Sequence, residues 1–228
     1  MADTKQNTQE TDHNQKVVDK AMNIWDKYSR QLMIGSAAII LLAGSYLGYK
    51  YFINEPNEKK ATDAIYKAED FYRQDSLNLA LNGDGVNLGF LKVIEKYGST
   101  KTGNLARFYA GDCYIKLDDN TKAIKYLNDF STDSKPIQAR AYKLIADANA
   151  DLGKNAEALK YYKKAASHFP EDDVNSSEYL FMAAFFAQKV MHDNEGAKEL
   201  FKSLKEKYPR TEKGFEADKY LAQLGVYN

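Results

Sequence analysis

The feature that most constrains this chain is a helical pattern that recurs in its C-terminal half. A pattern in which a small residue is followed, four positions later, by a bulky one occurs three times. The small residues are Ala123, Ala158 and Ala197. The two intervals between them are close to the length of one pair of packed helices with its turns. One such pair cannot bury its apolar face alone, so successive pairs have to stack. The repeat therefore predicts an all-α fold, an α-solenoid of about four helix pairs.

The ends of the predicted helices follow the same repeat. Turns of Asp, Asn and Gly type separate the two helices of a pair, and Pro170 and Pro209 follow the second helix. The residue before a proline avoids the α region, so each helix should stop there. Thr100 and Thr211 lie at matching places in two similar segments, 96–109 and 207–220, and are in position to cap a new helix. We therefore expect a closing helix over 211–224.

Small and bulky residues recur at fixed places in the middle of the chain: Gly111, Tyr114, Ala123, Leu127, Ala158, Ala165 and Pro170. This set resembles the signature of the tetratricopeptide repeat family, and the resemblance covers residues 104–209. The early Trp of the family is replaced by Arg107, Tyr142 and Phe181 in the three copies. In the third copy, Phe185 stands where a small residue is expected.

The resemblance implies a concave face, lined by the first helix of each pair, that binds another polypeptide. We predict an apolar and aromatic groove suited to a helix or an unfolded segment. The alternative is that several of these side chains pack between neighbouring helices, as aromatic residues at helical spacing usually do. The predicted partner-binding residues are Phe108, Asp112, Ile115, Lys143, Asp147, Tyr179, Met182 and Phe186. The same positional match includes Leu105, Lys116, Arg140, Ala150, Asp151, Lys189 and Val190.

The clamp that some members of this family use for C-terminal carboxylates is not expected here. It needs Lys and Asn at the positions that Phe108 and Asp112 occupy.

An uncharged run, residues 31–49, lies between Arg30 and Lys50. A helix needs about 20 residues to cross the hydrocarbon core of a bilayer. Aromatic residues flank both ends of the run, as interfacial anchors do. The run has no polar face, which disfavours a buried soluble helix. The long charge-balanced segment before it disfavours a cleaved signal peptide. The sequence therefore predicts a transmembrane helix over 31–53.

The residues before and within this span carry weaker patterns. Residues 1–14 are polar without periodicity, which predicts no regular structure. Gly44 and Gly48 have the spacing that lets two membrane helices approach closely, although chance placement in a span rich in small residues is the alternative. Basic residues are nearly balanced on the two sides, so they do not decide the orientation. An amphipathic lead-in is predicted from Val17, Val18, Ala21, Trp25, Tyr28 and Leu32.

Composition and motifs argue against other classes of function. Lys+Arg and Asp+Glu each number 32, so the basic excess expected of a nucleic-acid-binding protein is missing. Neither His13, His168 and His192 nor the single Cys113 has partners at metal-ligand spacing, and Cys113 is interpreted as a buried hydrophobe. Residues 82–85 look superficially like a calcium loop but lack its later Glu, which predicts a turn. We expect no enzyme, cofactor, metal or small-molecule substrate.

The predicted organisation follows from these segments. It comprises a polar tail with an amphipathic lead-in over 1–30, a transmembrane helix over 31–53, an atypical first helix pair over 54–103, tetratricopeptide-like repeats over 104–209 and a C-terminal capping helix over 210–228.

This layout resembles the ancillary subunit of the bacterial Sec translocon, a membrane-anchored tetratricopeptide protein. The resemblance implies a single-pass protein of the inner membrane with a cytoplasmic N-terminus and a periplasmic repeat domain. The implied partners are translocon subunits, periplasmic chaperones or exported chains. A cell-envelope or cell-division scaffold and a cytoplasm-facing receptor are the alternatives within the binding class. A repeat-regulated enzyme, and a soluble protein cleaved near residues 43–45, are the others.

Overall fold

A computed structural model describes the backbone of residues 3–227, and the side chains of this range except those of 3–19, 21, 23, 24, 26 and 32. Within that range every regular element is a helix, and the one β-type pairing is an isolated bridge between Gly83 and Leu88. The chain forms two compact units, residues 1–56 and 57–228. The predicted all-α repeat architecture is confirmed.

The first unit is built on one long helix, α1 (Asp3–Tyr49), followed by a π-helical stretch, Lys50–Asn54. The next helix, α2 (Glu55–Arg73), carries Pro56 in its first turn. Proline has no N–H, and its ring presses on the carbonyl four residues earlier. The widened π turn lies directly before this proline, and there a backbone N–H donates five residues back instead of four.

The described apolar side chains of α1 are exposed. Ile39 and Leu42 are 68% and 72% exposed. Among the described residues this is the one helix long and apolar enough to cross a bilayer, where the sequence predicts a span. A Cβ placed on Gly44 or Gly48 would meet nothing within 4 Å, and pairing with another helix stays a prediction.

The start of α1 corrects one expectation. The helix already begins at Asp3, so the prediction that residues 1–14 lack regular structure is wrong for the described part of that segment. This segment has no Gly or Pro and includes Lys, Gln and Glu, which favour helices. The side chains of Val17, Val18, Ala21 and Leu32, on which the amphipathic lead-in rests, lie outside the described residues, as does that of His13.

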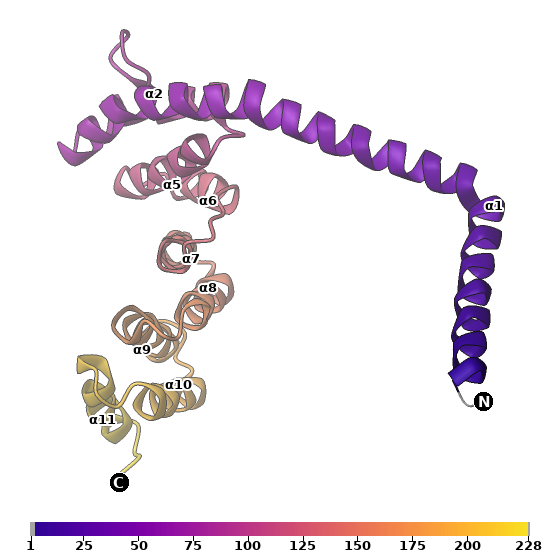
Figure 1. Cartoon of the computed structure of the whole chain (residues 1–228). Coiled ribbons are helices and arrows are strands. Elements are labelled where there is room, and N and C mark those ends of the chain that lie inside the picture. The colour runs from indigo at the N-terminus through magenta and orange to yellow at the C-terminus, as the bar shows by residue number, and fades with distance from the viewer. Residues whose placement is uncertain (1–2, 228) are drawn as a thin grey trace. The chain divides into compact units, whose positions relative to one another are not determined.

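The second unit is a row of stacked helix pairs, α5 with α6, α7 with α8, and α9 with α10, closed by α11. Figure 1 shows α5, α7 and α9 along one side of the row, the inner face, and α6, α8 and α10 along the other, the outer face. The bounds are α3 Leu77–Asn82, α4 Phe90–Tyr97, α5 Lys101–Lys116, α6 Asn120–Asn128, α7 Lys135–Asp151, α8 Asn155–His168, α9 Asp173–Lys189, α10 Asn194–Lys207 and α11 Glu212–Gln223.

The turn inside each pair is built alike. Asp118, Gly153 and His192 stand at the same repeat position, with φ of 60°, 69° and 56°. This left-handed region suits glycine, and Asp and His are among the other residues that tolerate it. The N–H of the next residue then bonds back into the first helix, as from Lys154 to the Asn149 carbonyl at 2.8 Å. The predicted Asp, Asn and Gly turns are confirmed.

The small residue of each first helix marks where the two helices of a pair cross. A Cβ on Gly111 would lie 2.5 Å from Leu127 Cγ, so only glycine fits between α5 and α6. The third copy differs because Phe185 turns to the closing helix, where its ring lies 5.9 Å from that of Tyr220. The capping helix thus provides the space that a large residue needs at this position.

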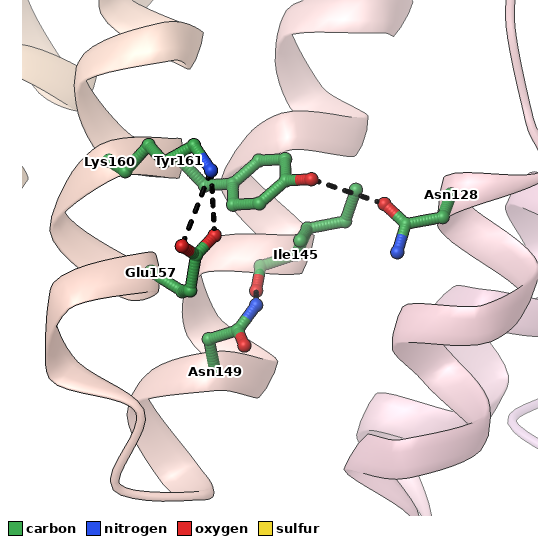
Figure 2. Close-up of polar contacts among 6 residues, drawn as sticks. All are labelled: Asn128, Ile145, Asn149, Glu157, Lys160 and Tyr161. Atoms are coloured by element: carbon green, nitrogen blue, oxygen red, sulfur yellow. Dashed lines mark hydrogen bonds and ion pairs between the residues drawn. The ribbon is translucent and has the colours of Figure 1, made fainter.

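Polar contacts also join one pair to the next (Figure 2). The Tyr161 hydroxyl of α8 donates to Asn128 Oδ1 of α6 at 3.3 Å, which links neighbouring helices of the outer face. Between them, the buried Asn149 amide donates to the Ile145 carbonyl at 2.8 Å within α7. A buried amide with a partner avoids the cost of an unsatisfied polar group.

The atypical first segment places α2 alongside α5. The Glu58 carboxylate of α2 accepts hydrogen bonds from the backbone N–H groups of Lys101 and Thr102, at 2.7 and 2.9 Å, and from the Thr102 hydroxyl at 2.6 Å. Helices α3 and α4 complete this segment and are separated by a turn. In that turn Asp84 accepts from the N–H groups of Val86 and Asn87, at 2.9 and 2.6 Å.

Thr100 and Thr211 cap α5 and α11 as predicted. The Thr100 hydroxyl accepts from the Gly103 N–H at 2.9 Å and donates to the Tyr97 carbonyl at 2.7 Å. In this arrangement the Tyr97 carbonyl lies against Gly103. A Cβ on residue 103 would overlap the carbonyl oxygen. Gly214 meets the Tyr208 carbonyl in the same way. At both places, the same pair of Thr and Gly thus allows a helix to begin directly after the chain reverses direction.

We expect Gly103→Ala to lower the free energy of unfolding by roughly 2 kcal/mol, because the methyl group collides with a backbone oxygen that cannot turn away. Denaturation of the full chain in detergent, followed by circular dichroism, measures the loss. Ser99→Ala, at an exposed position just outside the cap, is the control and should change little. Equal stability of the glycine variant and the wild type would contradict this packing.

The Glu58 cap predicts a pH dependence. Burial alone raises the pKa of this carboxyl, but the hydrogen bonds from Thr102 and Lys101 outweigh it and hold the pKa below the usual 4.5. Glu58→Ala should therefore cost about 1 kcal/mol of stability near neutral pH. Because the pKa of Glu58 is lower in the folded state than in the unfolded state, the ionised carboxylate stabilises the fold at pH values above 4.5. The stability difference between the wild type and Glu58→Ala should therefore shrink as the pH falls below 4.5. A difference that does not vary with pH would show that the carboxylate charge is unimportant.

Candidate protein-binding face

The residues predicted to bind a partner all lie on α5, α7 and α9, but half of them are deep in the structure. Phe108, Tyr179 and Phe186 are only 7%, 9% and 8% exposed, and Asp112 is 5% exposed. The rings of Phe108 and Phe186 pack on rings of neighbouring segments, at centroid distances of 5.4 and 5.6 Å. These side chains form the floor under the inner face, which matches the packing alternative left open by the sequence.

The other four predicted residues are half-buried and keep accessible surface. Ile115 lies on α5, Lys143 and Asp147 on α7, and Met182 on α9. Lys143 Nζ lies 2.6 Å from Asp147 Oδ2, so these opposite charges are paired on the face. The accessible surface is therefore mixed, because the charged pair on α7 lies between Ile115 on α5 and Met182 on α9. A role of these residues in binding stays a prediction.

Two aspartates at the same repeat position are held by tyrosines. The Tyr72 hydroxyl of α2 donates to Asp112, and the Tyr162 hydroxyl of α8 donates to Asp147 at 2.8 Å. Burial, and then the hydrogen bond to Asp112, raise the pKa of Tyr72. Burial, and then the nearby Asp147 charge, raise the pKa of Tyr162. Both phenols therefore stay protonated and able to donate.

A hollow of about 400 Å³ opens between the N-terminal parts of α5 and α7. Leu105, Phe130 and Ile137 supply its apolar lining, together with polar residues of the α6–α7 loop. Leu105 is among the positions that the sequence predicts for this face, whereas Phe130 and Ile137 are not. The repeat signature marks only certain positions of the first helices, and Phe130 lies in the loop after α6. Arg140 lies one turn after Ile137 on α7 and is exposed.

Chemistry other than binding has little support among the described residues. No group of His, Cys, Asp and Glu side chains there could hold a metal ion. Cys113 is buried, and burial raises the pKa of its thiol to about 12, so it is a packing residue rather than a nucleophile.

Substitution of the two tyrosines should have unequal effects. Tyr72→Phe leaves the buried Asp112 carboxylate without the donor it has here, and we expect it to lower the free energy of unfolding by about 2 kcal/mol. Tyr162→Phe should cost less, because Asp147 keeps Lys143. A double-mutant cycle of Tyr72→Phe with Asp112→Asn, measured by denaturation, should show strong coupling. Additive effects, or equal losses at the two tyrosines, would contradict this account.

Comparison with known families identifies the repeats. A tetratricopeptide repeat model matches residues 105–133 and 178–211, and a second tetratricopeptide repeat model matches residues 139–171. A search of curated proteins found no match to the chain. The matched segments coincide with the helix pairs α5–α6, α9–α10 and α7–α8. Residues 105–211 therefore carry three tetratricopeptide repeats, a fold that typically serves as a non-enzymatic scaffold for protein interactions.

Proposed function

We propose that this protein is a membrane-anchored scaffold that binds a polypeptide partner on the inner face of its repeats. The observation that carries the proposal is the stack of three tetratricopeptide repeats, whose first helices all meet on one face. The accessible Ile115, Lys143, Asp147 and Met182 contact the partner. The buried Phe108, Asp112, Tyr179 and Phe186 hold the helices that present them.

The exposed apolar surface of α1 supports the anchoring. Large hydrophobic side chains such as Ile40 and Leu41 are uncovered along this helix, and a bilayer is the solvent that removes such a surface from water. An anchor of this kind holds the repeats next to membrane-bound partners. Tethering raises the effective concentration of a partner and strengthens weak contacts without any new interaction.

The setting we propose is the Sec translocon of a bacterial inner membrane. The N-terminus is cytoplasmic and the repeats are periplasmic, where they bind translocon subunits, chaperones or newly exported chains. Support comes from the order of segments, with one N-terminal apolar helix followed by repeats and a closing helix. A scaffold of the cell envelope or of cell division, or a cytoplasm-facing receptor, remains the second candidate because the same order suits it.

Protease protection tests the orientation. In intact spheroplasts, an added protease should degrade residues 55–228, whereas inverted membrane vesicles should protect them. An epitope tag before residue 30 is the internal control and should behave in the opposite way. Protection of the repeats in spheroplasts would support the cytoplasm-facing receptor instead.

Photocrosslinking in the native membrane tests the binding face. A photoreactive residue in place of Met182, on α9, should form adducts with other polypeptides, which mass spectrometry then identifies. The same residue in place of Lys202, exposed on α10, is the control. Adducts that contain translocon subunits, chaperones or exported chains would support the translocon setting. Adducts from the outer face alone would contradict the proposed function.

A further inference from the structure

We propose that the hollow between α5 and α7, together with Arg140, is a subsite for a partner segment that carries an acidic side chain next to an apolar one. This inference rests on the proposed function and gives it a ligand chemistry. The hollow receives the apolar side chain, and the Arg140 guanidinium pairs with the neighbouring carboxylate.

The hollow is built from two adjacent repeats. Its apolar lining combines Leu105 of α5, Ile137 of α7 and Phe130 from the loop between α6 and α7. Leu105 and Ile137 keep exposed surface, whereas Phe130 is almost fully buried and forms the floor. Ligand pockets range from roughly 300 to 1,000 Å³, so about 400 Å³ gives room for a side chain or two and excludes a whole helix.

The loop that forms one wall is held in place by hydrogen bonds. The Asn104 amide donates to the Ser131 carbonyl at 2.6 Å. The Thr132 N–H donates to Gln138 Oε1 at 3.0 Å, and the Ser134 N–H donates to the Thr132 hydroxyl at 3.1 Å. A wall fixed before binding loses little conformational freedom when a ligand enters.

Arg140 does not line the hollow but lies one helical turn beyond Ile137, which does. Residues three apart on a helix are neighbours, so Arg140 lies on the same side of α7 as Ile137. Its guanidinium carbon lies 5.8 Å from the centre of the Phe108 ring, which sits under the same face. Phe108 in turn contacts the Phe130 floor at 5.4 Å between ring centres. The cation and the apolar hollow are thus parts of one continuous surface.

The guanidinium has no carboxylate partner among the described residues, unlike Lys143 and Lys116. Lys143 pairs with Asp147 at 2.6 Å, and Lys116 approaches Asp75 at 3.7 Å. Lys101 and Asp133 both line the hollow and offset each other in formal charge. Arg140 is therefore the uncompensated charge of the subsite, and an incoming carboxylate complements it.

The chemistry of arginine points to an acidic side chain rather than a neutral polar one. The planar guanidinium presents a fork of donors that matches the two oxygens of a carboxylate. Its approach to the Phe108 ring leaves its donors free, since the ring attracts the cation through its face. The position also allows one carboxylate and one apolar group to bind at the same time.

Selection from a phage-displayed library of random linear peptides tests the subsite. The bait is the full chain in nanodiscs, with its outer face unaltered. We expect the selected peptides to place Asp or Glu within two residues of Leu, Ile, Met or Phe. Their binding to Arg140→Gln should be about tenfold weaker, because this variant loses a charge-assisted hydrogen bond. Selection on Arg140→Glu should favour Lys or Arg at the acidic position.

Lys207→Glu is the matched control, because Lys207 lines another hollow with an apolar lining, between α8 and α10 on the outer face. The same change of charge there should leave the selected peptides bound. Arg140→Gln removes the charge without reversing it and keeps a polar side chain at an exposed position, so it remains a valid test if Arg140→Glu disturbs the fold.

The remaining outcomes separate the two proposals. Peptides without acidic enrichment, or with a preference unchanged in Arg140→Glu, would overturn the subsite while the binding function stands. Loss of binding in Lys207→Glu instead would move the site to the outer face and overturn both. Failure to enrich any peptide would likewise count against the subsite and the binding function together.

Discussion

The close crossing of the two helices in each pair is the constraint on which the rest of the repeat unit depends. Gly111, Ala146, Ala123, Ala158 and Ala197 are small where a helix meets its partner, and bulky Leu127 and Phe201 fill the adjacent holes. Such a pair has apolar surface on more than one side, so it is stable only when stacked on the next. Stacking leaves one side of the first helices uncovered, which is the inner face.

Polar groups within this stack have defined partners and thereby fix its geometry. Asp112 binds Tyr72 of α2, and Glu58 of α2 caps the start of α5. These two contacts lie near opposite ends of α2, so this helix is held along its length as if it were the first helix of another repeat. The buried Asp112 carboxylate already has a tyrosine donor, and the exposed Arg140 has no carboxylate partner among the described residues of this face.

Much of this fold could be predicted from the sequence, because the relevant signals are local or periodic. The spacing of Ala123, Ala158 and Ala197 defines the helix pairs, and Thr100 and Thr211 mark helix starts. The depth of Phe108 and Phe186 could not be predicted, since helical spacing marks both a groove wall and an inter-helix core. Contacts such as that between Tyr72 and Asp112 join residues far apart in the chain and leave no local pattern. The subsite could be predicted only in part. Leu105 and Arg140 match inner-face positions of the repeat, whereas Phe130 comes from a loop that the repeat signature does not cover.

We propose that the face of α5, α7 and α9 is open in the isolated protein and covered by another polypeptide in the membrane. Hydroxyl-radical footprinting of the full chain, in native membrane vesicles and after purification, measures this difference. We expect Met182 and Ile115 to be oxidised in the purified protein and protected in vesicles, while Tyr161 and Leu200 on the outer face react equally in both. Equal oxidation of the inner-face residues in the two states, or protection confined to the outer face, would contradict it.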